Sequence, residues 1–357
     1  MKILLTGSTG FVGKQLTLSL LEDGHDVYAL VRNQKKAENL VASTPFHLRE
    51  HLHLVEGDIT RDHAGIAEDM IRSLTQNIHA VYHMAAFLSF HKEDKEKTFK
   101  INYEGTKNIL ELARRLKVKH FFHVSTAYTL GKKFEAREEL HSVDLPFNNY
   151  YEESKCQAEH LALRYKDFFN VSIFRPSIII GDSRTGKADS AFALYGIIRS
   201  FDLLKRRMDR QKSPIKNFKF LCNPEIPQNF VPVDYVVKVL SAALNHAEDN
   251  TIYHITNSNP PTNQKICDMI RSSLDIWNVE VVPTSYQGEL TAEETRFNEP
   301  ISVFYPYWER AIEFFDHNTR RLLKEANLKP LDLTEDMLKK IVSGSKAAET
   351  EVFAAKG

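Results

Sequence analysis

The sequence contains little cysteine and no long apolar run. Three cysteines, Cys156, Cys222 and Cys267, stand far apart without a Cys-x-x-Cys pair. This spacing indicates neither a disulfide framework nor a cysteine zinc site, and we expect a reducing compartment. No apolar run approaches about 18 residues, the length of a membrane span. Lys2 leads directly into a short apolar run and a glycine, which leaves no room for the core of a signal peptide. We therefore expect a cytoplasmic protein without an integral membrane segment.

The sequence also lacks an excess of either charge. Its 47 Lys and Arg residues balance 47 Asp and Glu residues, so no overall field attracts nucleic acid. Histidines cluster at positions 47, 51 and 53, but no acidic partner is evident from the sequence and the spacing crosses a predicted boundary between helix and strand. We expect solvated histidines and no metal site.

Apolar runs and helical periodicities alternate along the first half of the chain. Strands are predicted at 2–6, 26–32, 53–58, 80–86, 120–126, 171–180 and 251–255, and helices at 12–21, 98–116, 151–168, 263–275, 308–326 and 335–342. Strands that alternate with helices and read as continuous apolar runs are buried on both faces. The pattern predicts an α/β fold with a Rossmann-type, doubly wound parallel sheet.

The periodicity becomes less regular after Gly181. We expect a nucleotide-binding core over 1–180, with a returning strand within 228–257. The segments 181–227 and 258–345 are predicted to form a smaller C-terminal substrate-binding lobe, and 346–357 a disordered tail.

A glycine-rich loop separates the first predicted strand from the first predicted helix. Its sequence, Gly7-Ser-Thr-Gly10-Phe-Val-Gly13, has the spacing Gly-x-x-Gly-x-x-Gly. Glycines at such a place permit a tight turn and let backbone amides approach a pyrophosphate at the helix N-terminus. The loop predicts nucleotide binding, against the plainer alternative of a tight strand-to-helix turn.

The end of the second predicted strand bears on the choice of cofactor. NAD sites usually offer Asp or Glu to the ribose hydroxyls there, whereas this chain has Arg32. A guanidinium can bind a 2′-phosphate with two hydrogen bonds, which favours NADPH over NADH. Asp58 can accept from the adenine amino group, and Ala85 and Ala86 are small enough for close approach of the cofactor.

Tyr151 and Lys155 stand four residues apart, and Tyr151 follows Thr126 by 25 residues. On a helix this spacing places phenol and ammonium on one face, where the cation would lower the tyrosine pKa from about 10 toward neutrality. A phenol tuned in this way can give or take a proton. Such a pair is also common on exposed helices, so its meaning depends on the glycine loop.

Taken together, these residues resemble the extended short-chain dehydrogenase/reductase superfamily. The resemblance covers about the first 180 residues and rests on Gly7-x-x-Gly10-Phe-Val-Gly13, Gly57-Asp58-Ile59, His83-Met-Ala85-Ala86, Asn102-x-x-Gly105-Thr106, Val124-Ser125-Thr126, Tyr151-x-x-x-Lys155 and Arg175-Pro176-Ser177. The branch of thioester reductases and fatty acyl-CoA reductases is similar in Tyr151-Glu-Glu-Ser-Lys155-Cys-Gln-Ala-Glu, Gly181-Asp-Ser-Arg-Thr-Gly186, Phe230-Val-Pro-Val-Asp234 and Phe315-Asp316-His-Asn318.

The resemblance implies roles for individual residues. Thr126 would polarise the substrate carbonyl, Tyr151 would donate the proton, and Lys155 would hold the nicotinamide ribose. Ser125 is adjacent, but neighbouring strand residues face opposite sides of a sheet, so only one of the two can serve, and we choose Thr126. The predicted cofactor contacts are Gly7, Thr9, Gly10, Phe11, Val12, Gly13, Arg32, Asp58, Ile59, Ala85, Ala86, Tyr151, Lys155, Pro176, Ser177 and Ile178.

The resemblance implies an NADP-dependent oxidoreductase that reduces an acyl thioester, bound to a carrier protein or to CoA, to an aldehyde or alcohol. Three alternatives stay open: reduction of a free aldehyde or ketone, a nucleotide-sugar epimerase or dehydratase, and a non-catalytic NADP-binding protein. The dehydratase pattern of Asp-Glu after the catalytic Thr is replaced by Ala127-Tyr128, and retention of Thr126, Tyr151 and Lys155 speaks against a mere sensor. The chain length and true carrier of the substrate stay open.

A local excess of positive charge interrupts the balanced composition. From Arg199 to Lys219 the chain has eight Lys or Arg against two Asp, a net charge of +6, interleaved with apolar residues. Such an element suits docking of an acidic acyl carrier protein, contact with a CoA phosphate or a membrane surface, or a plain solvated helix face. A homodimer is a further possible partner arrangement.

Overall fold

The computed structural model describes residues 1–188, 194–210 and 217–354, and the chain divides into two units. Unit 1 comprises Met1–Ser177, Tyr235–Thr256 and Phe314–Pro330, and unit 2 comprises Ile178–Asp234, Asn257–Glu313 and Leu331–Gly357. Both units are therefore built from three separate stretches of sequence.

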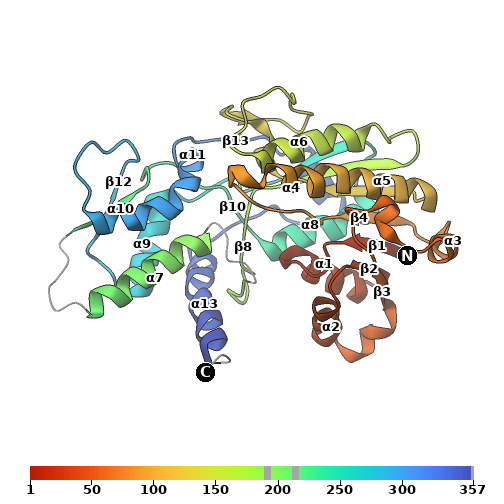
Figure 1. Ribbon diagram of the computed structural model, residues 1–357, viewed down its shortest axis with the longest axis horizontal. Helices are drawn as coiled ribbons and strands as arrows, with labels where there is room; N and C mark the ends of the chain where they lie inside the picture. Colours follow the sequence, from red (N-terminus) through yellow and green to blue (C-terminus); the bar gives the residue numbers. More distant parts are fainter. Residues whose placement is uncertain (189–193, 211–216, 355–357) are drawn as a thin grey trace. The chain divides into compact units, whose positions relative to one another are not determined.

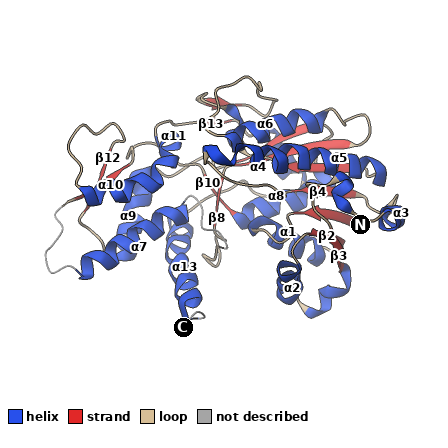
Figure 2. Ribbon diagram, viewed as in Figure 1, coloured by secondary structure: helices blue, strands red, loops and turns tan. Residues whose placement is uncertain are grey.

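A seven-stranded parallel sheet forms the centre of unit 1 (Figure 2). Its strands are β1 (Lys2–Thr6), β2 (Asp26–Val31), β3 (Leu52–Glu56), β4 (Ala80–His83), β5 (His120–Val124), β7 (Asn170–Pro176) and β11 (Thr251–Ile255). They lie in the order β11-β7-β5-β4-β1-β2-β3, and every neighbouring pair is parallel. The prediction of a Rossmann-type doubly wound sheet is confirmed.

Helices cover the two faces of this sheet (Figure 1). Those of unit 1 are α1 (Phe11–Glu22), α2 (Gln34–Ser43), α3 (Glu68–Leu74), α4 (Lys95–Phe99), α5 (Gly105–Leu116), α6 (Tyr150–Leu163), α8 (Val233–His246) and α12 (His317–Glu325). A π-helical turn, Lys100–Glu104, joins α4 to α5. Short 3₁₀ turns lie at Phe46–His51, Asp62–Gly65, Lys92–Asp94 and Ala127–Leu130.

The alternation of side chains along each strand explains the two layers. One face carries Leu4, Val81 and Phe121, which belong to a buried cluster with the apolar faces of α3, α5 and α6. On the other face Tyr82 and Phe122 begin a row of aromatic rings, with centroids 4.6 Å apart. The hydroxyl of Tyr82 donates to the carbonyl oxygen of Leu240 on α8, so the polar end of this buried ring is satisfied.

Unit 2 contains two small parallel strand pairs and five helices among its described residues. Its strands are β8 (Ile178–Ile180), which pairs with β10 (Phe230–Pro232), and β9 (Phe218–Leu221), which pairs with β12 (Val279–Val282). Its helices are α7 (Leu194–Arg210), α9 (Asn263–Leu274), α10 (Ala292–Asn298), α11 (Tyr305–Trp308) and α13 (Glu335–Ala354), with a 3₁₀ turn at Glu299–Phe304. Gly186, at φ +72°, lies so close to α13 that a Cβ atom there would meet the carbonyl oxygen of Lys340 at 2.3 Å.

Two predicted elements differ from the structure. The strand expected over 171–180 is interrupted at Ser177: the Ser177 amide donates to Ile255 in β11, whereas the Ile178 amide donates to Asn229 beside β10. The helix expected over 308–326 is replaced by α11, the strand β13 (Glu313–Phe314) and α12. β13 pairs with β6 (Glu135–Ala136), a long-range contact that sequence periodicity does not report.

The C-terminal segment predicted as a disordered tail, 346–357, is assigned to α13 as far as Ala354, and 355–357 lie outside the described residues. Within the described part of the chain, no helix is both long enough and apolar enough to cross a bilayer.

Candidate active site

The strand order of unit 1 reverses between β1 and β4. From β1 the chain continues to β2 and β3 on one side, whereas β4, β5 and β7 extend the sheet on the other. Ligands of open α/β sheets bind at the carboxyl ends of the strands at such a switch point. The glycine loop leaves the carboxyl end of β1, and Ala85-Ala86 follow that of β4, so both predicted cofactor elements lie at this point.

The glycine loop is shaped by backbone crowding. Gly7 has φ +78°, and a Cβ atom there would lie 2.8 Å from the amide nitrogen of Ala85. A Cβ atom on Gly13 would lie 2.0 Å from the carbonyl oxygen of Gly7. No side chain caps the N-terminus of α1 at Gly10. The tight turn and the uncapped amides of a twelve-residue helix therefore fit a pyrophosphate.

Arg32 and Asp58, predicted to contact different parts of an adenosine, lie against each other. Arg32 Nη1 is 3.6 Å from Asp58 Oδ2, and the arginine side chain is 69% exposed. Burial alone would raise the pKa of Asp58, but hydrogen bonds from Thr60 and the charge of Arg32 hold it below its usual value. Asp58 is therefore anionic at neutral pH. Ile59, the next residue, packs against Gly105 at the start of α5.

Lys155 is a buried cation at the carboxyl end of β5. Its side chain is 2% exposed, and Nζ donates a hydrogen bond of 2.6 Å to the carbonyl oxygen of Val124. Thr126, two residues further on, is also buried, and its Oγ1 accepts from the amide of Tyr128 at 3.3 Å. Tyr151 lies one turn before Lys155 on the same face of α6. The structure thus brings this end of β5 next to the helix that carries the predicted phenol and ammonium.

The pKa of Tyr151 contradicts the sequence-based expectation. Burial, with a smaller contribution from the charge of Glu152, raises it to about 12 instead of lowering it toward neutrality. Burial likewise lowers the pKa of Lys155 to about 8, although the charge of Glu159 opposes this change. The expectation considered the ammonium alone and overlooked the cost of forming a phenolate away from water. Tyr151 is therefore a neutral phenol at working pH, and in this form it has a proton to donate.

A buried ion pair that the sequence did not indicate fixes the orientation of α6. Arg175 on β7 binds Glu159 on α6 through two hydrogen bonds of 2.9 and 2.6 Å, and both side chains are fully buried. Burial, then the charge of Arg175, lowers the pKa of both His141 and His254 to about 3. These neutral imidazoles lie 3.4 and 3.3 Å from Arg175 Nη1 and, with the carbonyl oxygen of Arg137 at 3.2 Å, share its protons as acceptors. Removing one member of such a pair costs about 3–5 kcal/mol.

The predicted nicotinamide contacts at Pro176, Ser177 and Ile178 fall at the boundary of unit 1. Pro176 and Ser177 are buried in unit 1, directly after Arg175, and Ser177 Oγ has no hydrogen-bond partner among the described residues. Ile178 belongs to unit 2, where it pairs with Phe230.

The histidines singled out in the sequence have an acidic neighbour after all. His51 Nδ1 and His53 Nε2 lie 3.1 and 3.4 Å from Asp26 Oδ1, and hydrogen bonding to His51 holds the pKa of Asp26 below its usual value. The sequence pattern did not indicate Asp26 as a partner, because it lies on the neighbouring strand, 25 residues before His51. No group of three ligands suited to a metal ion occurs within residues 1–188, 194–210 and 217–354.

Comparison with known families agrees with this geometry. Residues 5–240 match the NAD-binding family described as male sterility protein. The chain belongs to this family. The resemblance to the thioester reductase branch of the extended short-chain dehydrogenase/reductases, which are NAD(P)-dependent oxidoreductases, is thereby confirmed.

Two relatives illustrate the range of the family. A linear gramicidin synthase of Brevibacillus parabrevis is 24% identical over 95% of this chain and 7% of its own length. A putative fatty acyl-CoA reductase of Drosophila melanogaster is 27% identical over 66% of this chain and 52% of its own. The chain thus spans about half or less of these two relatives.

Solved structures share the fold. The terminal R domain of the myxalamid PKS-NRPS pathway superposes with a TM-score of 0.81 and 21% identity over 98% of this chain and 91% of its own. A thiolation-reductase di-domain of an archaeal non-ribosomal peptide synthetase gives 0.76 and 18%, over 98% and 76%. A UDP-glucuronic acid 4-epimerase from Bacillus cereus in complex with NAD gives 0.68 and 19%, over 97% and 96%.

Proposed function

We propose that this protein is a cytoplasmic, NADPH-dependent reductase of acyl thioesters. The observation that carries the proposal is the set of groups near the carboxyl end of β5. A hydroxyl (Thr126), a neutral phenol (Tyr151) and a buried ammonium (Lys155) lie in the same unit as the β1–α1 glycine loop. Among the matched relatives and structures, a fatty acyl-CoA reductase and two reductase domains of biosynthetic assembly lines support a thioester substrate.

The chain's own residues supply the proton and bind the developing charge. When a hydride adds to a carbonyl carbon, negative charge grows on the oxygen, and two hydroxyl donors directed at it stabilise the transition state. Thr126 Oγ1 accepts from a backbone amide, which leaves its proton for the substrate. Tyr151, a phenol with a raised pKa, transfers its proton to the oxygen as the charge forms. Lys155 holds the ribose and places a positive charge beside the site.

The reduced nicotinamide, when bound, supplies the hydride. A thioester that gains a hydride at carbon and a proton at oxygen becomes a hemithioacetal. Its C–S bond then breaks as the carbonyl re-forms, the hydroxyl proton passes to the departing sulfur, and the products are an aldehyde and a free thiol. With the hydride of a second reduced nicotinamide, the same groups would convert the aldehyde into an alcohol. The protein therefore needs no nucleophile of its own, in agreement with the raised pKa of the Cys156 thiol, which burial takes to about 12.

Arg32 supports NADPH as the cofactor. Its guanidinium is mostly exposed and stands at the end of β2, where the 2′ position of the adenosine ribose is expected. Asp58, 3.6 Å away, weakens the attraction for a phosphate, so the preference depends on both residues. A 2′-phosphate that binds Arg32 would replace the Arg32–Asp58 ion pair, in which the arginine side chain is already largely solvated.

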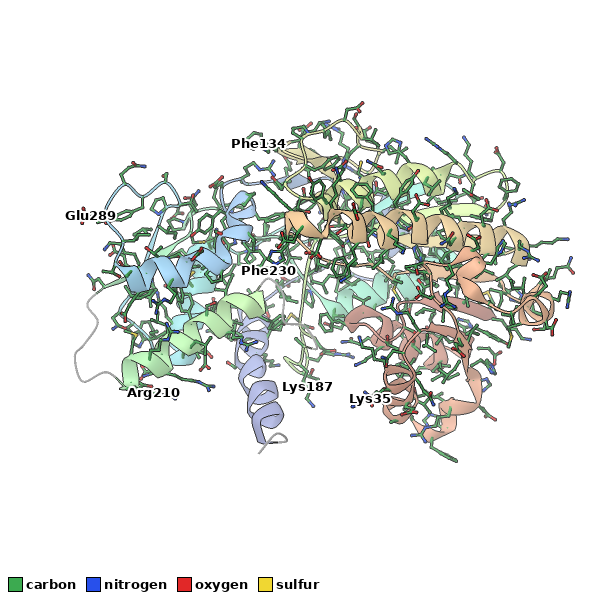
Figure 3. All side chains as sticks on the ribbon, viewed as in Figure 1. Lys35, Phe134, Lys187, Arg210, Phe230 and Glu289 are labelled. Carbon is green, nitrogen blue, oxygen red and sulfur yellow. The ribbon has the colours of Figure 1, made fainter. Side chains whose placement is uncertain are left out.

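An exposed stripe on α7 supports an acidic carrier protein as the source of the substrate. Lys205 and Arg206 are ion-paired within the helix, to Asp209 and Asp202 respectively, each at 2.8 Å. The excess charge of the described part therefore comes from other positions. Arg199, Arg207 and Arg210 are exposed, and Arg210 ends the helix in Figure 3.

We name Arg199, Leu203, Arg207 and Arg210 the α7 stripe, because the spacing of these residues places them along one side of the helix. Leu203 is 50% exposed although the opposite side of α7 is buried. An apolar centre among cations suits an acidic partner with a small apolar contact. Lys212 and Lys216 of the basic segment lie outside the described residues.

A panel of substrates tests the proposed function. The protein is incubated with NADPH and, separately, with acyl-CoA, carrier-bound acyl groups, free aldehydes or ketones, and UDP-sugars, and the loss of NADPH absorbance is followed together with the products. Aldehyde or alcohol formed from a thioester supports the proposal. Turnover of free carbonyl compounds alone would favour a reductase of free aldehydes or ketones, and conversion of UDP-sugars would favour an epimerase. Binding without any turnover would indicate a sensor.

A further inference from the structure

His83 ends β4 and is buried between the glycine loop and α5. Its side chain is 1% exposed, and both ring nitrogens have partners: Nδ1 lies 2.8 Å from Thr6 Oγ1, and Nε2 lies 3.0 Å from Thr106 Oγ1. His123, stacked on it at 5.6 Å, has no hydrogen-bond partner for either nitrogen among the described residues. The two neighbouring histidines thus differ in their hydrogen bonding: of the two, His83 alone bridges two hydroxyl groups.

The donors around His83 fix the direction of each hydrogen bond in the series that runs from Thr6 through His83 and Thr106 to Asn102. Thr6 Oγ1 accepts from the amides of Met84 and Ala85, at 3.2 and 3.1 Å, so its own proton points to His83 Nδ1. His83 Nδ1 is then an acceptor, and the ring proton of the neutral imidazole lies on Nε2, which donates to Thr106. The Thr106 hydroxyl donates in turn to the carbonyl oxygen of Asn102 at 2.6 Å.

A neutral imidazole is required for this arrangement, because an imidazolium would present two donors. Burial, assisted by the charge of Lys155, lowers the pKa of His83 to about 3. The ring is therefore neutral at working pH and keeps one donor and one acceptor.

One end of the chain of hydrogen bonds lies at the glycine loop. Thr6 directly precedes Gly7, and its hydroxyl holds the amide of Ala85, the atom that a Cβ on Gly7 would approach to 2.8 Å. Both Gly7 and Ala85 are among the predicted cofactor contacts. The hydroxyl that His83 orients therefore helps to hold the loop to the end of β4, beside the backbone hydrogen bond of 3.3 Å from the Met84 amide to the Thr6 carbonyl oxygen.

The other end lies under the catalytic helix. Asn102, in the π-helical turn before α5, donates through Nδ2 to Ser154 Oγ at 3.0 Å, and Ser154 donates to the carbonyl oxygen of Tyr151 at 2.8 Å. Buried hydrogen-bond networks of this kind are rigid, since an unpaired member costs the full desolvation of a polar group.

We infer that His83 is a positioning residue, which through Thr6 and Thr106 sets the glycine loop for cofactor binding and couples it to the helix that carries Tyr151 and Lys155. The inference concerns how this chain binds the nicotinamide cofactor of the proposed function and does not depend on the acyl substrate.

Thr106→Val tests the inference, because valine keeps the shape of threonine but leaves the His83 Nε2 proton without its acceptor and removes the hydroxyl that donates to the Asn102 carbonyl. NADPH binding is measured by fluorescence titration of the intact chain, with the thermal midpoint recorded in parallel. We expect the Kd for NADPH to rise roughly fivefold to tenfold, the effect of one lost buried hydrogen bond. Thr106→Ser, which keeps the hydroxyl, should restore the affinity to within about twofold.

Thr17→Val is the matched control. Thr17 is a fully buried threonine of α1, and its hydroxyl has no partner among the described residues, so the same change removes no hydrogen bond. It should leave the Kd unchanged. If Thr106→Val lowered the thermal midpoint but bound NADPH as the parent does, His83 would be a structural residue only and the inference would be wrong.

A spectroscopic measurement tests the direction of these hydrogen bonds, on which the inference depends, even if Thr106→Val fails to fold. Nitrogen NMR of the parent protein, with His83→Gln for assignment, should find the His83 proton on Nε2, and a proton on Nδ1 would overturn the inference. Failure of the parent to bind either NADPH or NADH would instead refute the proposed function, and the inference with it.

Discussion

Lys155 Nζ donates a hydrogen bond of 2.6 Å to the carbonyl oxygen of Val124, so that the ammonium of α6 is anchored at the carboxyl end of β5. Burial favours the neutral amine and lowers the pKa of Lys155 to about 8. The side chain therefore carries its positive charge below this pH and loses it above. The charge assigned to ribose binding is therefore lost within a pH range that is easily measured.

We expect the affinity for NADPH and kcat/KM to be constant from about pH 6 to 7.5 and to fall above about pH 8, as Lys155 loses its proton. Tyr151 cannot account for such a fall, because its pKa is raised to about 12. Titration of NADPH binding against pH gives the apparent pKa directly. Lys155→Arg, which keeps a positive charge at all these pH values, should remove the alkaline decline. An apparent pKa near 10 would show that burial does not perturb this lysine.

Tyr151→Phe should lower turnover by roughly 10²-fold or more and leave the Kd for NADPH nearly unchanged, because only the proton donor is removed. The measurement compares kcat with the binding titration. Tyr150→Phe is the matched control, since Tyr150 is the neighbouring tyrosine on α6 and its ring, not its hydroxyl, contacts Lys95 at 4.9 Å. Equal turnover in the two variants would exclude Tyr151 as the proton donor.

The sequence was sufficient for the parts of the site that are local. The glycine loop follows β1 directly, and Tyr151 and Lys155 share one helical turn, so neither requires knowledge of distant contacts. The doubly wound parallel sheet follows from the alternation of strands and helices, whereas the order of its strands comes from the structure. The same pattern placed Arg32 and Asp58 near the ends of β2 and β3, where the structure has them. It did not reveal that the two side chains pair with each other.

Burial and long-range pairing could not be predicted in this way. Arg175 and Glu159 carry opposite charges on different elements, and nothing in their spacing indicates that both are fully buried. β13 pairs with β6, which lies about half the chain length earlier in the sequence, and this pairing interrupts the helix expected over 308–326. The pKa of Tyr151 was mispredicted for a related reason, since a periodicity reveals neighbours on a helix but not the water that folding removes.

Arg32→Asp should shift the preference from NADPH toward NADH, because the new carboxylate repels a 2′-phosphate and accepts from ribose hydroxyls. Since Arg32 is largely exposed, we expect the ratio of kcat/KM for the two cofactors to change by about tenfold. Asp58→Asn provides the opposite test: removal of the carboxylate 3.6 Å from Arg32 should strengthen NADPH binding. If neither substitution altered the ratio, the pair would lie outside the reach of the 2′ position.

The α7 stripe makes a prediction about salt. Acyl carrier proteins are generally acidic, so kcat/KM for a carrier-bound substrate should fall as salt rises, and that for a small free aldehyde should change much less. The triple substitution Lys205→Gln, Arg206→Gln, Arg207→Gln should reproduce the high-salt behaviour in part, because the first two cations already have partners in the helix.

The triple substitution Arg199→Gln, Arg207→Gln, Arg210→Gln should have the larger effect, about tenfold at low salt, since these exposed cations are not offset within α7. Lys117→Gln, Lys119→Gln, Lys166→Gln makes the same change in net charge on unit 1, where Lys119 precedes β5 and Lys166 follows α6, at the end of the sheet opposite the active site. This control should leave kcat/KM for the carrier-bound substrate unchanged. If both triple variants lost activity equally, the effect would reflect net charge alone. If neither did, the α7 stripe would be a solvated helix face, and a free carbonyl compound would become the better candidate substrate.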